Sequence, residues 1–351
     1  MQLNRLLEYP LLTYSTVRSA HYTIQYDLLN RIAKYVPGLQ GPQIPEDVYA
    51  GKLIRENLFK LLRKDVQNAV NGMYPISVFQ PESPVRHVKR LGRIIYDGFG
   101  LARRRASRES HQFSKRAKSY LEDVPEYYRR NYHFQTDGYL SDWSADLYEH
   151  QVELLFGGTG DAMRRLLIPP MKKHFSDRPD GRGLTFLELG AGTGRATRNV
   201  RLAFPKARIV ATDLSEPYLR NARKNLEGFA RMDFVRADAA DLPFADEKFD
   251  AVYSVFTLHE IPLEPRKAIL KEAHRVLKKK GFLGLVDTAQ LGDIPEFDPI
   301  FKNFPVSFHE PYYTNYIKTP IEKLVKAQKF KLLGSETGFF SKVTWATKSE
   351  R

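Results

Sequence analysis

The sequence predicts an α/β protein with a mostly parallel sheet and helices on both faces, and three observations support this class. An apolar segment of strand type at 184–189 leads into three alternate glycines, after which a helical pattern begins at Arg195. From 183 to 287, short apolar segments alternate with helical ones. Two final strand-like segments, 331–336 and 342–347, are separated by a short turn. Strand–helix–strand units give parallel strands, whereas a short turn joins antiparallel ones.

The remaining strands are expected at short intervals after the glycine turn. Apolar segments predict them at 207–213, 232–238 and 249–256. A helix around 321–328 is expected before the closing pair.

The stretch Leu184–Gly194 carries the strongest functional signal. A buried strand, a glycine turn and a helix N-terminus bring backbone close to a ligand and point free N–H groups toward negative charge. A dinucleotide fingerprint requires a small residue three places after its second glycine. Counted from Gly192, that place is Arg195, so an NAD-dependent reductase is the least favoured interpretation.

The order Glu-x-Gly-x-Gly-x-Gly, from Glu188 to Gly194, resembles motif I of the class I S-adenosylmethionine (SAM) methyltransferases. The next two strands are expected to end on Asp213 and Asp238, as in this family, and the segment 278–287 resembles its late motif. The resemblance covers roughly half of the chain, from about 180 onward. It implies a seven-stranded, mostly parallel Rossmann-like sheet, a SAM cofactor and methyl transfer.

The resemblance also implies roles for individual residues. Glu188 is expected to face the amino end of the methionine, Asp213 to bind the ribose hydroxyls and Asp238 to bind the adenine. The glycines are also consistent with a plain strand-to-helix turn, and Asp238 or Asp241 with a helix cap. The full set of expected cofactor-binding residues is Glu188, Gly190, Ala191, Gly192, Gly194, Asp213, Leu214, Asp238, Ala239 and Phe256.

The acceptor side has a thinner signal, in the segment Leu258-His-Glu-Ile-Pro262. Adenine-N6 and glutamine methyltransferases carry an acidic or amide residue, two prolines and an aromatic residue here, and this chain does not. The segment looks more like the small-molecule branch, which includes quinone C-methyltransferases. His259 is the tentative general base because histidine titrates near neutrality, although a packing or capping role also fits. Weaker candidates are Glu260, His309, Tyr312 and Tyr313, and no metal site is predicted.

Three regions are expected along the chain. Residues 1–125 are predicted to form a basic, mainly helical accessory domain, residues 126–180 an aromatic-rich helical lid or linker, and residues 181–351 the catalytic domain. Within the second region, Tyr132, His133 and Tyr139 are candidate lid residues, and packing at a domain interface fits them equally well.

The accessory region is expected to be helical in three parts. They lie within 1–40, over 46–70, where apolar residues recur at helical spacing, and from 85 onward. A loop rich in Pro and Gly is predicted at 36–45.

The formal net charge of +14 is concentrated in the N-terminal third, where residues 1–118 hold 20 Lys and Arg against 9 Asp and Glu. Such a surface can attract nucleic acid, anionic lipid or an acidic protein. A specific nucleic-acid site is not favoured, because the basic run 103–118 contains one aromatic residue for base stacking, Phe113. A solvated helical surface, with the run 103–118 as an exposed linker or lid, is the simpler expectation.

Composition excludes several classes of chemistry. The absence of cysteine rules out disulfides, thiolate metal sites and methylation through a cysteine nucleophile. No apolar run reaches the length of a membrane span, and the N-terminus lacks the apolar stretch of a signal peptide. We therefore expect a cytoplasmic protein. Peripheral contact with a membrane and the oligomeric state are left open.

The function expected from these observations is SAM-dependent methyl transfer, by in-line displacement, to a small acceptor that is aromatic, quinol-like or lipid-like. The acceptor and the element that is methylated are not specified by the sequence. One alternative is an RNA or protein methyltransferase that docks its acceptor through the basic N-terminal region. The other is a SAM-binding regulatory module without turnover.

Overall fold

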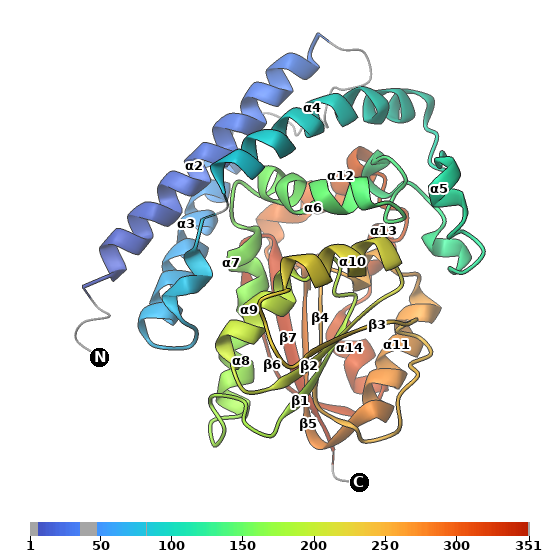
Figure 1. Ribbon diagram of the computed structural model, residues 1–351. Helices are drawn as coiled ribbons and strands as arrows, with labels where there is room; N and C mark the ends of the chain where they lie inside the picture. The colour runs from blue at the N-terminus through green and yellow to red at the C-terminus, as the bar shows by residue number, and fades with distance from the viewer. Residues whose placement is uncertain (1–5, 36–47, 82, 350–351) are drawn as a thin grey trace.

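The computed structural model describes residues 6–35, 48–81 and 83–349. Its centre is a seven-stranded sheet in which the first five strands are parallel and β7 runs antiparallel to both neighbours (Figure 1). This arrangement confirms the predicted fold class. From edge to edge the strands are β3 (Met232–Arg236), β2 (Arg208–Asp213), β1 (Thr185–Leu189), β4 (Phe249–Val255), β5 (Leu277–Thr288), β7 (Ser341–Lys348) and β6 (Phe330–Gly338).

Two hydrophobic clusters cover the two faces of the sheet. Along β1, Phe186 belongs to one cluster and Leu187 to the other, because successive side chains of a strand point to opposite faces. The first face is covered by α3 (Val48–Val70), α7 (Gly160–Arg164), α8 (Ile168–His174) and α9 (Arg195–Ala203), and the second by α11 (Leu263–Val276), α13 (Tyr313–Lys318) and α14 (Ile321–Ala327).

The N-terminal helices lie across the end of the sheet at which its parallel strands finish (Figure 1). There, α2 (Glu8–Ala33) packs on α3 and on α6 (Asp142–Leu155), while α4 (Pro84–Ser107) and α10 (Glu216–Asn225) also pack on α6. The remaining helices are α5 (Lys115–Lys118) and α12 (Asp298–Phe308), and the 3₁₀ turns are η1 (Ile76–Phe79), η2 (Glu126–Tyr128), η3 (Tyr132–Phe134), η4 (Arg165–Leu167), η5 (Leu258–Glu260) and η6 (Pro295–Phe297).

The structure differs from the sequence-based expectations at two places. The third strand ends at Arg236, two residues before Asp238. The basic run 103–118 is not an exposed linker throughout, because α4 continues to Ser107 and buries Arg104. The Arg104 guanidinium donates hydrogen bonds to the carbonyl oxygen of Phe134 and to Thr136, at 2.8 Å each. The loop predicted at 36–45 lies outside the described residues.

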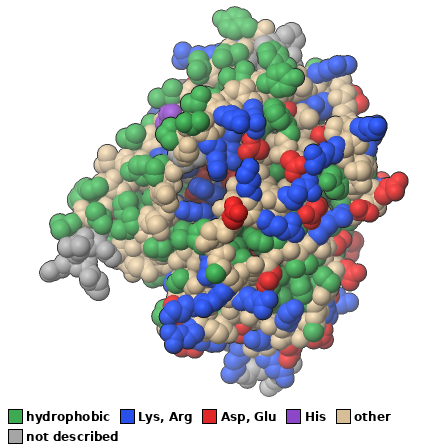
Figure 2. All heavy atoms as spheres, in the orientation of Figure 1, with side chains coloured by type: hydrophobic (Ala, Val, Ile, Leu, Met, Phe, Trp, Pro, Cys, Tyr) green, Lys and Arg blue, Asp and Glu red, His purple; other side chains and the backbone are tan. Residues whose placement is uncertain are grey.

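One face of the molecule has a basic hollow between α4 and the helices α9 and α10 (Figure 2). Arg86 and Lys89 of α4 border it, together with Arg198 of α9 and Lys224 of α10. None of these four side chains forms an ion pair with an acidic residue in the described part of the chain. Within the same described ranges, no helix has the length and apolarity needed to cross a membrane.

A histidine cluster joins α2, α4 and α6. The rings of His87 and His150 lie 4.4 Å apart between centroids, and Gln25 of α2 bridges them through contacts of 2.8 and 3.4 Å. Burial, followed by the nearby His87, lowers the pKa of His150 from its ordinary value to about 3. His150 is therefore neutral in the folded protein at pH values where it is protonated in the unfolded chain.

We expect mild acid to destabilise this helical layer. The contribution of a neutral His150 to the free energy of unfolding is highest above pH ~6.5 and falls as the pH falls toward 3. Over this range His150 binds a proton in the unfolded chain but not in the folded protein. The loss should be at most about 2 kcal/mol at about pH 5. Urea unfolding at several pH values measures it. The substitution His150→Gln should reduce the loss, whereas His111→Gln, at an exposed site, should leave it unchanged.

Candidate functional site

A cavity lies where β1, β2 and β4 end, and it brings together most of the residues that the sequence predicted for cofactor binding. The glycine turn, both strand-end carboxylates of β1 and β2, and the loop after β3 all border it. Nine predicted residues line this cavity: Glu188, Gly190, Ala191, Gly192, Asp213, Leu214, Asp238, Ala239 and Phe256.

Gly194, the tenth predicted residue, does not line the cavity. It precedes α9 with a φ of 82°, and a Cβ at this position would lie 2.6 Å from Leu226. Glycine is therefore required at this position by backbone geometry and by close packing against α10. Gly190 lies at a second close approach, since its φ is 68° and an added Cβ would lie 2.4 Å from Oγ1 of Thr257.

One buried carboxylate, that of Glu188, and one partly buried carboxylate, that of Asp213, face the glycine turn. Burial raises the pKa of Glu188 to about 8, although its carboxylate accepts a hydrogen bond from the Tyr253 hydroxyl at 3.0 Å. Burial also raises the pKa of Asp213 to about 6. Two hydrogen bonds of 2.8 Å, from the backbone N–H groups of Gly192 and Ser215, lower this pKa but do not outweigh the burial. A positively charged ligand group would stabilise both carboxylates in their ionised form.

Tyrosines form the wall of the cavity opposite the glycine turn. Tyr132 and Tyr139 stack with centroids 5.3 Å apart, and Tyr218 of α10 meets Tyr139 edge-on at the same separation. Tyr128 and Tyr148 complete this wall. Of the three lid residues proposed from the sequence, Tyr132 and Tyr139 thus line the cavity and His133 does not. Tyr128 and Tyr148 were not singled out, although the density of tyrosine between 127 and 148 was an available signal, and no sequence signal pointed to Tyr218.

A chain of ionisable groups starts at this tyrosine wall. Glu260 borders the cavity, and its Oε1 accepts a hydrogen bond from the Tyr139 hydroxyl at 2.5 Å. His133 lies behind it, with Nε2 3.3 Å from Glu260 and Nδ1 3.1 Å from Oε1 of Glu310. Burial raises the pKa of Glu310 to about 7. Burial alone would lower the pKa of His133, but Glu310 and Glu260 outweigh it and raise that pKa.

The same three side chains have the composition of a metal site, since one ligand atom from each of His133, Glu260 and Glu310 falls within a 4.8 Å span. The two carboxylates, however, approach opposite nitrogens of the His133 ring. A cation takes a lone pair from one ring nitrogen, whereas a protonated imidazole donates from both. The geometry therefore favours an imidazolium held between two carboxylates, and a metal-free site stays our prediction.

His259, the general base proposed from the sequence, is not among the residues that border the cavity. Its Nδ1 lies 2.5 Å from Oδ1 of Asp287, whose other oxygen accepts the backbone N–H of Leu258 at 2.8 Å. Burial opposes protonation, but Asp287 raises the pKa of His259 to about 10. A histidine that already holds its proton at neutral pH cannot accept another, so the geometry favours a structural role for His259.

Three of the four weaker candidates, His309, Tyr312 and Tyr313, also lie away from the cavity. His309 packs on Phe134 with centroids 4.9 Å apart, and burial lowers the pKa of His309 to about 4. Tyr313 is buried against Phe304, and Tyr312 contacts Arg130. Of the acceptor-side residues named from the sequence, Glu260 alone borders the cavity.

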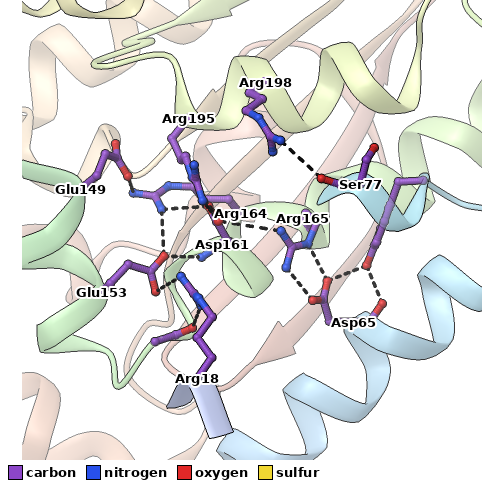
Figure 3. Close-up of polar contacts among 12 residues, drawn as sticks. Arg18, Asp65, Ser77, Glu149, Glu153, Asp161, Arg164, Arg165, Arg195 and Arg198 are labelled. Atoms are coloured by element: carbon purple, nitrogen blue, oxygen red, sulfur yellow. Dashed lines mark hydrogen bonds and ion pairs between the residues drawn. The ribbon is translucent and has the colours of Figure 1, made fainter. Parts of the chain in front are cut away.

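Buried ion pairs fix the glycine turn from below (Figure 3). Arg195, the first residue of α9, donates to both oxygens of Asp161 in α7, with Nε at 2.8 and 3.0 Å. Glu149 of α6 accepts a hydrogen bond from Thr193 of the turn and pairs with Arg164 at 2.9 Å. Arg195, whose size argued against a dinucleotide fingerprint, thus anchors the glycine turn to the helices beneath it.

Comparison with known proteins gives a consistent result. Residues 186–281 match the family model described as a methyltransferase domain. The chain is 40% identical to a demethylmenaquinone methyltransferase of Clavibacter sepedonicus over 144 residues, which is 41% of this chain and 52% of that protein. It is 34% identical to a fatty-acid O-methyltransferase of Mycolicibacterium smegmatis over 128 residues, covering 36% of this chain and 45% of that one. The chain thus spans about half the length of these two relatives.

A more complete match is the ubiquinone/menaquinone biosynthesis C-methyltransferase UbiE of Rhizobium meliloti. The identity is 30% over 196 residues, which cover 51% of this chain and 70% of that protein. Among solved structures, the PH0226 protein of Pyrococcus horikoshii aligns over 53% of this chain and 90% of its own, with 22% identity and a TM-score of 0.42.

Proposed function

Because the chain belongs to the class I SAM-dependent methyltransferases, we propose that it transfers the SAM methyl group to a small acceptor that is aromatic, quinol-like or lipid-like. One observation carries the proposal. A single cavity joins the glycine turn and its carboxylates to a tyrosine wall and to Glu260. Donor and acceptor can therefore meet in one enclosed space, as in-line displacement requires.

The residues present fit the cofactor. Glu188 and Asp213 place two carboxylates beside a glycine turn, which suits a ligand with a cationic amino end and a ribose. Asp238 and Ala239 border the far end of the cavity, where we assign the adenine. SAM supplies an activated, electrophilic methyl group, so the protein contributes position, exclusion of water and proton removal.

The tyrosine wall is proposed to act as a lid. The cavity measures about 100 Å³, below the roughly 300–1,000 Å³ of ligand pockets, so the wall has to move when the cofactor enters. Tyr139 is held to the start of α10, because its backbone carbonyl accepts a hydrogen bond at 2.5 Å from Ser215, the N-cap of that helix. When the wall closes, it excludes water and strengthens the electrostatic interactions inside.

Glu260 is proposed as the general base in place of His259. Its carboxylate faces the cavity and can accept a proton from an acceptor hydroxyl or an activated carbon. The Tyr139 hydroxyl orients this carboxylate through a hydrogen bond, and the His133 ring lies behind it. The proton taken from the acceptor would rest on Glu260 until solvent removes it after the lid opens.

The cofactor assignment is tested by calorimetric titration with SAM and with NADH. We expect SAM to bind and NADH not to bind. The substitution Asp213→Ala should weaken SAM binding by roughly 10- to 100-fold, because it removes an acceptor of charge-assisted hydrogen bonds. Asp233→Ala is the matched control, since Asp233 is a half-exposed carboxylate on the neighbouring strand that pairs with Arg208. Equal SAM affinity in both variants contradicts the proposed ribose contact, and absence of SAM binding contradicts the assignment itself.

The basic hollow favours RNA as a second candidate acceptor. Arg86, Lys89, Arg198 and Lys224 are cations without an acidic partner in the described ranges, and such a surface attracts phosphate. Steep loss of RNA binding with rising salt, reduced by the substitutions Arg86→Ala and Lys224→Ala, would support this candidate. Methyl transfer to small quinols or phenols that does not depend on these two residues supports our first proposal instead.

A further inference from the structure

We propose that the acceptor carries a hydrocarbon chain and that this chain lies in a second cavity, formed by α2, α4 and α6. This inference rests on the proposed function and specifies the class of its acceptor, namely an amphiphile with one polar, methyl-accepting end. The cavity has a volume of about 240 Å³. Its apolar lining includes Leu29 of α2, Ile94 and Leu101 of α4, Val152 and Leu155 of α6, and Phe308 at the end of α12.

The position of this cavity relative to the cofactor site is the first argument. Tyr148 borders both cavities. His133 borders the second cavity and lies 3.3 Å from Glu260, which borders the first. The two spaces are thus separated by one layer of side chains. A chain held between the helices would direct its polar end toward Glu260 and the glycine turn.

The polar groups of the second cavity provide the second argument. Asp97, its one carboxylate, already accepts hydrogen bonds from Thr136 at 2.6 Å and from Trp143 at 3.2 Å. Arg105 lies over the ring of Phe134. Three amide side chains and the His133 ring also border the cavity, but its wall is mainly apolar, which suits a hydrocarbon better than a peptide or a nucleotide.

The mouth of the cavity provides the third argument. Ile32, Ile95 and Phe99 line the cavity, yet they remain 44%, 40% and 58% exposed. Large apolar side chains that are clustered and exposed mark binding sites more often than ordinary surface. Ile32 lies on α2, Ile95 and Phe99 lie on α4, and all three line the same cavity as Tyr148. A chain that enters past these side chains would cover all three.

The test uses the whole protein and a series of n-alkanols from hexanol to dodecanol. Each alcohol competes with cis-parinaric acid, a fluorescent fatty acid, for the second cavity. We expect affinity to rise by roughly three- to fourfold for each added methylene until the cavity is full. The substitutions Leu29→Trp and Ile94→Trp, on two different helices, fill the cavity and should abolish this rise. Val17→Trp is the matched control, because Val17 is exposed on α2 and lies outside the cavity.

Two outcomes overturn the inference. One is an affinity that does not depend on chain length in the unmodified protein. The other is an equal loss of binding in Ile94→Trp, Leu29→Trp and Val17→Trp. Calorimetric titration of each variant with SAM separates this inference from the proposed function. If the alcohols do not bind in the second cavity while SAM binding and methyl transfer to short acceptors persist, only the chain-binding role of this cavity is overturned and the proposed function stands.

Discussion

Replacing Glu260 by Gln is expected to lower kcat by about 10²- to 10⁴-fold, the usual contribution of a general base. The amide keeps the size of the side chain and can still accept the hydrogen bond from Tyr139, but it cannot take a proton from the acceptor. SAM affinity and KM should change little, because the substitution acts on a proton transfer and not on binding. Methyl release from labelled SAM, with phenols and quinols as acceptors, measures the effect.

The matched control for this substitution is Glu264→Gln. Glu264 is 76% exposed and pairs with Lys267 on the outer surface of α11, so its loss should leave kcat unchanged. The experiment also decides whether Glu260 or its neighbour His259 is the general base. Full turnover in Glu260→Gln together with inactivity in His259→Gln would restore His259, the base expected from the sequence, and overturn our reassignment.

The largest loss of stability is expected from Asp161→Ala, at about 3–5 kcal/mol. Asp161 is buried, and although burial opposes its ionisation, Arg195 holds its pKa well below the ordinary value. Removing this carboxylate leaves the charge of Arg195 without the partner that binds it at two points. Urea unfolding followed by circular dichroism measures the change in the free energy of unfolding.

Asp177→Ala controls for the loss of an acidic residue, because Asp177 pairs with its neighbour Arg178 and is 68% exposed. This control should change the free energy of unfolding by less than about 1 kcal/mol. Asp161→Ala should also weaken SAM binding, since Arg195 begins the helix that follows the glycine turn. A loss below 1 kcal/mol in Asp161→Ala would mean that the buried ion pairs contribute little beyond the packing around them.

The cofactor half of the site could be predicted because its residues are fixed by local sequence. Glu188, the glycine turn and Asp213 lie at the ends of adjacent parallel strands, and the strand–helix–strand order alone brings such ends together. The fold was predictable for the same reason. The burial of Arg104 in the basic run could not be predicted, because it depends on the carbonyl oxygen of Phe134 and the hydroxyl of Thr136, about 30 residues further along the chain.

The acceptor half depends on contacts between distant segments, which no local pattern reveals. His133, Glu260 and Glu310 come from three separate parts of the sequence and meet only in the folded protein. Which of His259 and Glu260 borders the cavity also depends on residues that are distant in the sequence. The turn η5 places them in different surroundings, and Asp287, at the end of β5, holds His259 away from the cavity. Asp287 is itself paired with Lys342 near the start of β7, so its position is fixed by the sheet.

The shared wall of the cofactor cavity limits how this protein can be divided. A gene fragment that began at residue 181, the boundary predicted for the catalytic domain, would encode the whole sheet and every strand-end carboxylate. It would lack Glu149 and Asp161, which hold Thr193 and Arg195, and every tyrosine of the wall except Tyr218. Recombining this sheet with the helices of another family member would therefore exchange half of a binding site. The transferable unit of this enzyme is the sheet together with the helices that face its glycine turn.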